Sequence, residues 1–189
     1  MWIIKKDIIE LFVPGRLCLF GEHSDWAGQM RKFNSEIVPG KALVACINEG
    51  IYATARICEN LKLSTVMPDG TIQSCEYPMD SSHLRNVASE GGYFSYIAGV
   101  AAYLSTFYNI GGIELDCFKV TLPQKKGLSS SAAICVLAAR AFNRLYGLNL
   151  TVRGEMEAAY NGEVDTIQMR AFRSGLRLWK RYCRYDIRW

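Results

Sequence analysis

The 189-residue sequence predicts an α+β fold in which most strands precede most helices. Its first half contains short runs rich in β-branched residues, which are typical of buried strands. Pro68, Asp69 and Gly70 separate two alternating runs and predict a β-hairpin. The second half contains apolar residues at helical spacing, with glycines at their ends. A chain of this length suits one domain or two small ones.

The strands are expected in a simple order along the chain. Residues 8–12 and 17–20 flank Pro14 and Gly15, which predict a turn between two strands. Residues 26–41 are polar and contain glycine, so they predict a loop long enough to hold a substrate. Further strands are expected at 42–45, 51–57, 61–67, 71–77 and 113–122.

Four helices are expected after the hairpin. Residues 81–90 predict a short one, and residues 93–107 predict a second, which is ended by Gly111 and Gly112. A third covers 130–146 with Gly147 as its stop, and a fourth runs from an N-cap at Thr151 to about 163. The aromatic residues of the second helix are expected in the core: Tyr93, Phe94, Tyr96 and Tyr103.

A loop rich in glycine and serine, residues 122–133, runs directly into the third predicted helix. A helix N-terminus offers unpaired N–H groups and a partial positive charge. Gly127 would let the backbone approach a ligand closely, and three serines that follow it add hydroxyl donors. Together these features predict a phosphate site. The alternative is a serine N-cap on an ordinary helix, which needs one serine rather than three.

A second segment, residues 14–28, reads Pro-Gly-Arg-Leu-Cys-Leu-Phe-Gly-Glu-His-Ser-Asp-Trp-Ala-Gly. This segment and the Pro-x-x-x-Gly-Leu-Ser-Ser-Ser-Ala run at 123–132 resemble, in the same order, two motifs of the GHMP kinases, ATP-dependent kinases of small metabolites. The Glu-His-Ser-Asp run is most similar to the galactokinase-like branch, where Glu-His-Thr-Asp is typical. The mevalonate kinase branch lacks that aspartate.

The resemblance covers about residues 10–165 and implies the N-terminal domain of that family, a ribosomal-protein-like two-layer α/β sandwich. It also implies ATP and Mg²⁺ as cofactors and a small-molecule sugar as substrate. The residues matching the ATP-binding motif are Pro123, Gly127, Leu128, Ser129, Ser130, Ser131 and Ala132.

The resemblance further implies that Ser131 holds the magnesium ion, with Glu163 as the candidate carboxylate. A hydroxyl and one carboxylate suit Mg²⁺, which keeps several waters. Arg16 matches an arginine that stabilises charge on the reacting groups, a role that suits a guanidinium. The alternatives are a solvated helix glutamate at 163 and a surface arginine beside the predicted turn.

On the sugar side, the matching residues are Glu22, His23 and Asp25, whose side chains can hydrogen-bond to vicinal hydroxyls. The alternative is a locally paired turn in which Asp25 caps the backbone. Trp26 replaces the tyrosine usual in galactokinases, and residues 29–32 depart from their glycine-rich continuation. Both departures leave the identity of the sugar open.

The composition of the chain indicates whether it spans a membrane and whether its cysteines are reduced. The first residues lack a signal peptide, and the longest apolar run is too short and too polar to span a bilayer. Seven cysteines occur without a Cys-x-x-Cys pair, which indicates reduced thiols in a cytoplasmic protein. The sequence therefore indicates no membrane partner, and it carries no signal for an oligomeric state.

Residues 167–189 form a basic tail, with seven basic residues and one acidic residue in a chain of net charge +4. Such a tail can bind nucleic acid. However, codons for 165–189 can be chosen that, read one base downstream, spell Thr-Pro-Ser-Lys-Cys-Gly-Arg-Leu-Asp-Gln and then a strand-like run. That sequence resembles the third GHMP motif, whose aspartate is the catalytic base. We therefore interpret 1–165 as an incomplete kinase domain and 166–189 as an out-of-frame tail, with no nucleic acid as partner.

The predicted function is ATP-dependent phosphorylation of a small-molecule hydroxyl, most consistent with a galactokinase-like sugar kinase. The chain as given is expected to be inactive, because it lacks the aspartate of the third motif and the family's C-terminal domain. The alternatives are a kinase of another alcohol, of the mevalonate or homoserine type, and a catalytically dead member that binds sugar or ATP.

Overall fold

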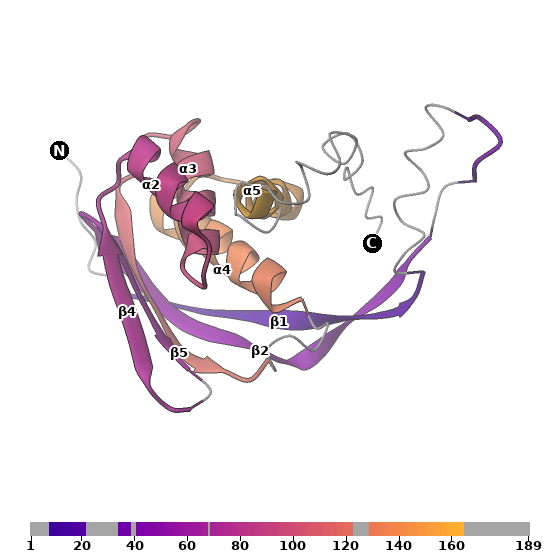
Figure 1. The fold of residues 1–189 in the computed structure, drawn as a ribbon, viewed down its shortest axis with the longest axis horizontal. Coiled ribbons are helices and arrows are strands. Elements are labelled where there is room, and N and C mark those ends of the chain that lie inside the picture. Colours follow the sequence, from indigo (N-terminus) through magenta and orange to yellow (C-terminus); the bar gives the residue numbers. More distant parts are fainter. Residues whose placement is uncertain (1–7, 22–33, 39–40, 68, 123–128, 165–189) are drawn as a thin grey trace.

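The computed structural model describes residues 8–21, 34–38, 41–67, 69–122 and 129–164. Within these ranges, a mixed sheet of five strands is covered on one face by four helices (Figure 1). The arrangement confirms the α+β class and the two-layer architecture that the sequence predicts.

The sheet has the strand order β1-β2-β5-β3-β4. Neighbouring strands are antiparallel except for β3 and β5, which run parallel. Because β5 is the central strand, the loop that follows it starts from the middle of the sheet. The strands are β1 (Ile9–Phe20), β2 (Leu43–Cys58), β3 (Leu61–Val66), β4 (Ile72–Tyr77) and β5 (Gly112–Val120).

The predicted turn at Pro14 and Gly15 is wrong, because β1 is one continuous strand. Its pairing with β2 shifts between Pro14 and Arg16, so this stretch lies opposite a bulge of β2 and does not form a turn. Since β1 lies at the edge of the sheet, it tolerates a proline that cannot donate to the ladder. The proline and glycine correctly indicated an irregular stretch of backbone, but they did not indicate that the strand continues through it.

The two strands predicted at 42–45 and 51–57 are likewise one strand, β2. The residues between them belong to the same strand although the pairing is irregular there: Pro14 pairs with Gly50 and Arg16 pairs with Cys46, so the extra residues of the bulge lie on β2. A Cβ on Gly50 would lie 2.5 Å from the carbonyl oxygen of Val13. Glycine here permits a close approach of the two backbones and does not end the strand.

The hairpin and all four helices are confirmed. Gly70 has φ 83° and donates its N–H to the Met67 carbonyl at 2.9 Å, which closes the turn between β3 and β4. The second helix is shorter than predicted and ends at Ser105. None of the described helices is long and apolar enough to cross a membrane. The helices are α2 (Ser81–Glu90), α3 (Ser95–Ser105), α4 (Ser130–Tyr146) and α5 (Val152–Val164).

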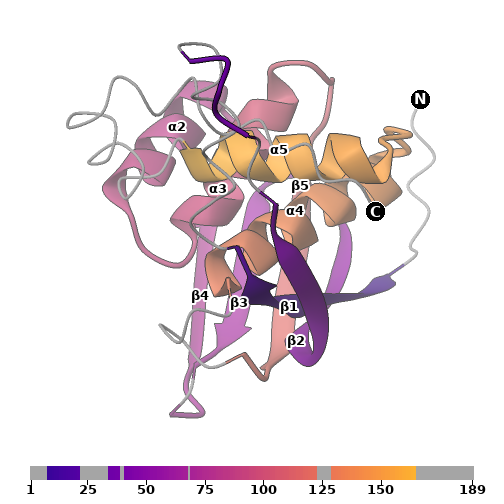
Figure 2. The ribbon, with the colours of Figure 1, turned by 90° about the vertical axis from the view of Figure 1, so that its right-hand side faces the viewer.

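The core lies between the sheet and the helices. Alternate residues of the strands face it, so Leu11 and Val13 of β1 are buried while Phe12 between them is exposed. Helix α4 packs on β1, β2 and β5, and α5 lies across α3 and α4 (Figure 2). The four aromatic residues expected in the core pack against it: Tyr93, Phe94, Tyr96 and Tyr103. Helix α4 is therefore packed between the sheet on one side and helices α3 and α5 on the other.

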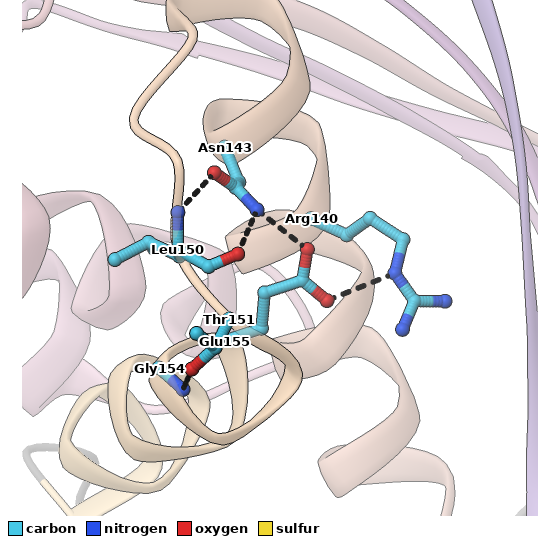
Figure 3. Close-up of polar contacts among 6 residues, drawn as sticks. All are labelled: Arg140, Asn143, Leu150, Thr151, Gly154 and Glu155. Carbon is cyan, nitrogen blue, oxygen red and sulfur yellow. Dashed lines mark hydrogen bonds and ion pairs between the residues drawn. The ribbon is translucent and has the colours of Figure 1, made fainter.

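A polar cluster fixes the connection between α4 and α5 (Figure 3). The Asn143 side chain donates to the Leu150 carbonyl at 3.1 Å and to Glu155 Oε1 at 2.8 Å, and it accepts from the Leu150 N–H at 2.9 Å. Arg140 donates to the other oxygen of Glu155 at 3.0 Å, and this carboxylate is buried. One amide thus satisfies three groups where the chain reverses direction.

We expect Asn143→Ala to lower the free energy of unfolding by about 2 kcal/mol, because it leaves partly buried polar groups of Leu150 and Glu155 without this partner. Urea unfolding measures the change. Asn161→Ala is the matched control, since among the described residues the Asn161 amide bonds only within its own helix, to Glu157. Equal losses in the two variants would contradict a special role for the cluster.

Candidate functional site

Arg16 of β1 lies beside the start of α4. Its Nε donates to the Oγ of Ser129 at 3.3 Å, although the two residues are 113 positions apart. The preceding glycine explains the approach, since a Cβ on Gly15 would clash with the side chain of Leu122, at the end of the segment after β5. The two segments that the sequence singled out therefore meet in space.

Ser129 is the N-cap of α4, but it does not behave as an ordinary capping serine. It has φ 56° and ψ 44°, and its side chain makes no capping hydrogen bond. The left-handed conformation costs a non-glycine residue roughly 1–2 kcal/mol. Its hydroxyl instead accepts from Arg16. This geometry argues against the simple N-cap interpretation of the serine run.

Ser130, Ser131 and Ala132 form the first turn of α4 and are partly exposed. The N–H groups of a first helical turn lack intrahelical partners and point out along the helix axis. Together with the partial positive charge of the helix N-terminus, they can bind an anion. The guanidinium of Arg16 adds a full positive charge at the same end.

Glu163, in the last turn of α5, reaches this end of α4. Its carboxylate accepts a hydrogen bond from the hydroxyl of Ser131 and interacts electrostatically with Arg16. Burial raises the pKa of Glu163 above its ordinary value, while Ser131 and Arg16 act in the opposite direction. The structure thus brings together Arg16, Ser131 and Glu163, which the sequence predicted separately.

Two further residues surround the Glu163 carboxylate. Tyr96 of α3 has a pKa raised by burial and then by the negative charge of Glu163. Cys135, fully buried one turn after Ser131 on α4, has its pKa raised by the same two causes. Sequence reasoning did not place either residue at the site, because helical spacing marks both only as core. Four elements therefore converge on Glu163: β1, α3, α4 and its own helix α5.

The other predicted site residues lie outside the described residues: Glu22, His23, Asp25, Pro123, Gly127 and Leu128. The described part ends beside them at Gly21, which has φ 82° and lies so close to Lys41 that a Cβ would clash with its carbonyl oxygen. This contact explains the glycine of the Gly-Glu-His motif. The predicted sugar-side contacts stay predictions.

The donor atoms at the site fit a magnesium ion. Ser131 and Glu163 supply a hydroxyl and a carboxylate in mutual contact, and Mg²⁺ prefers hard oxygen ligands while keeping several waters. Among the described residues, no group of three or more His, Cys, Asp or Glu could hold a metal ion.

Comparison with known proteins agrees with this geometry. Residues 95–170 match the family model of the GHMP kinases N terminal domain, a stretch that includes α3, α4 and α5. This part of the chain is therefore similar to the N-terminal domain of the GHMP kinases. The resemblance inferred from the two sequence motifs is thereby confirmed.

Proteins similar to this chain include galactokinases. The chain is 28% identical over 166 residues to the galactokinase of Clostridium beijerinckii, covering 79% of the chain and 38% of that protein. The crystal structure of Lactococcus lactis galactokinase complexed with galactose superposes with a TM-score of 0.65 and 27% identity, over 86% of this chain and 39% of that one. The chain thus spans about two fifths of these relatives' length.

The same fold occurs in a kinase of another alcohol. Methanococcus jannaschii mevalonate kinase superposes with a TM-score of 0.62 at 17% identity, over 85% of this chain and 47% of that one. At this identity the likeness concerns the fold alone.

Proposed function

We propose that this GHMP kinase domain is the nucleotide-binding part of an ATP-dependent sugar kinase of the galactokinase-like branch. The observation that carries the proposal is the junction of Arg16, Ser129, Ser131 and Glu163 at the N-terminus of α4. The relationship to galactokinases at 28% identity supports a sugar over other alcohols.

The phosphates of ATP would lie at the first turn of α4. Backbone N–H groups from Ser130 onward would hold them, and Arg16 would offset their negative charge. Ser129 would present its hydroxyl there because its left-handed conformation keeps it from capping the helix. Pro123, Gly127, Leu128 and Ala132 complete the proposed ATP site.

Ser131 and Glu163 would hold the magnesium ion. When bound, Mg²⁺ neutralises charge on the phosphates during phosphoryl transfer. The contact between the two side chains supports this assignment, because it already places both donor oxygens together. Glu22, His23 and Asp25 are proposed to bind the sugar hydroxyls.

The chain as given is proposed to bind ATP without transferring its phosphoryl group. It lacks a Gly-x-x-Asp-Gln sequence, so the aspartate that serves as catalytic base in the resembled family is missing. The out-of-frame interpretation of 166–189 accounts for this absence. Resequencing the gene across codons 160 to 189 tests it: a one-base shift restores the motif, and an unchanged read contradicts the interpretation.

The decisive test of function is calorimetric titration of the chain with ATP in the presence of Mg²⁺. We expect a dissociation constant on the order of 1 µM to 1 mM, the range of typical KM values of enzymes. An assay of ATP consumption with a panel of sugars, mevalonate and homoserine follows, on a gene in which the motif is restored. Absence of ATP binding at millimolar concentration would contradict the proposal, and turnover only with a non-sugar alcohol would move the domain to another branch.

A further inference from the structure

Helices α3 and α5 cross with their backbones in direct contact, at Gly99 on α3 and Gly162 on α5. A Cβ on Gly99 would clash with the carbonyl oxygen of Gly162. A Cβ on Gly162 would lie 2.6 Å from the backbone nitrogen of Val100 and 2.5 Å from its Cγ2. Most of these neighbours are backbone atoms, so a side chain at either glycine would force the helices apart.

This crossing lies next to the proposed magnesium ligand. Glu163 follows Gly162 directly, so a displacement of α5 at Gly162 would move the Glu163 side chain with it. Tyr96, one turn before Gly99 on the same face of α3, interacts electrostatically with the Glu163 carboxylate. The same carboxylate meets Ser131 on α4, so it lies between the two helices.

The separation of packed helices depends on the side chains at their contact. Larger residues at the crossing would place α5 farther from α3, and the carboxylate of Glu163 would then draw away from the Ser131 hydroxyl. A glycine inside a helix costs about 1 kcal/mol relative to alanine. Each of the two facing glycines therefore lowers the stability of its own helix. The close crossing of α3 and α5 explains why glycine is present at both positions.

We propose that Gly99 and Gly162 are positioning residues, which set the distance between α3 and α5 so that Glu163 meets Ser131. The proposal concerns the geometry of the ligand-free chain. It rests on the proposed function in one respect: the contact between Glu163 and Ser131 would hold the magnesium ion of the kinase.

The test is a double-mutant cycle of Ser131→Ala and Glu163→Gln, measured by urea unfolding without ATP or metal. In the parent chain we expect the two side chains to be coupled by roughly three- to ten-fold in the unfolding equilibrium constant, in the lower part of the range for residues in contact. The cycle is then repeated with Gly162→Ala and with Gly154→Ala. Gly154 is the matched control on α5, since a Cβ there meets only side-chain atoms, the nearest belonging to Leu150 at 3.3 Å.

We expect the coupling to disappear in Gly162→Ala and to persist in Gly154→Ala. A purely structural role would lower the stability of all four proteins of the cycle equally and leave the coupling unchanged, and that result would overturn the proposal. If Gly162→Ala does not fold, Val100→Ala loosens the same crossing without a clash. The coupling should then fall at least about two-fold, and an unchanged value again overturns the proposal.

Failure of the proposed function can be told apart from failure of this inference. A chain that does not bind ATP but loses the coupling in Gly162→Ala would retain the positioning role and lose the kinase assignment. A chain that binds ATP with Mg²⁺ but keeps the coupling in Gly162→Ala would retain the kinase assignment and lose the positioning role.

Discussion

Replacing Glu163 with glutamine is expected to weaken magnesium-dependent ATP binding by at least about ten-fold. The substitution keeps the size of the side chain and removes the negative charge that would hold the ion beside Ser131. Residues that only support a metal ligand already contribute 10- to 100-fold to metal affinity, so loss of a ligand should cost no less. Calorimetry with ATP in Mg²⁺ and in EDTA measures the effect, which should occur only in Mg²⁺.

Glu157→Gln is the matched control for this prediction. Glu157 lies on the same helix and is exposed, and within the described part of the chain it bonds only to Asn161 of that helix. It should leave ATP binding unchanged in both buffers. An equal loss in the two variants, or a loss in EDTA as large as in Mg²⁺, would show that Glu163 acts through general charge and not as a metal ligand.

The sequence predicted the helical half of the fold more accurately than the strand half. Helix α4 begins at Ser130 and ends before Gly147, as expected, because its boundaries are encoded locally by a serine run and by a glycine that adopts φ 60°. The strands β1 and β2 were each divided in two, because Pro14 and Gly50 resemble turn residues when only neighbours in sequence are considered. Their extended conformation depends on pairing between strands, which is a long-range effect.

The candidate site was predicted as separate residues and not as a constellation. Motif resemblance selected Arg16, Ser131 and Glu163, but no spacing in the sequence states that β1, α4 and α5 meet. That meeting depends on the close approach of Gly15 to Leu122 and on the contact of Gly99 with Gly162. A glycine inside a predicted helix was the available signal for the second contact, because such a residue commonly has a packing reason.

Replacing Phe142 with alanine is expected to lower the free energy of unfolding by about 3–5 kcal/mol, a large part of the stability of a small domain. Phe142 lies in the second half of α4 and is fully buried. Its ring stacks on Tyr146 with the centroids 6.2 Å apart. The substitution would leave a cavity under the helix that carries the proposed phosphate site, and packed backbones around it can close it only in part.

Phe107→Ala is the control for this prediction, since Phe107 is 65% exposed and follows α3 on the surface. It should cost less than about 1 kcal/mol in the same urea unfolding experiment. If Phe142→Ala leaves too little folded protein to measure, Phe142→Leu keeps most of the apolar volume and should give an intermediate loss. Similar values for Phe142→Ala and Phe107→Ala would contradict the placement of α4 between the sheet and α5. That result would remove the support on which the geometry of Ser131 and Glu163 depends.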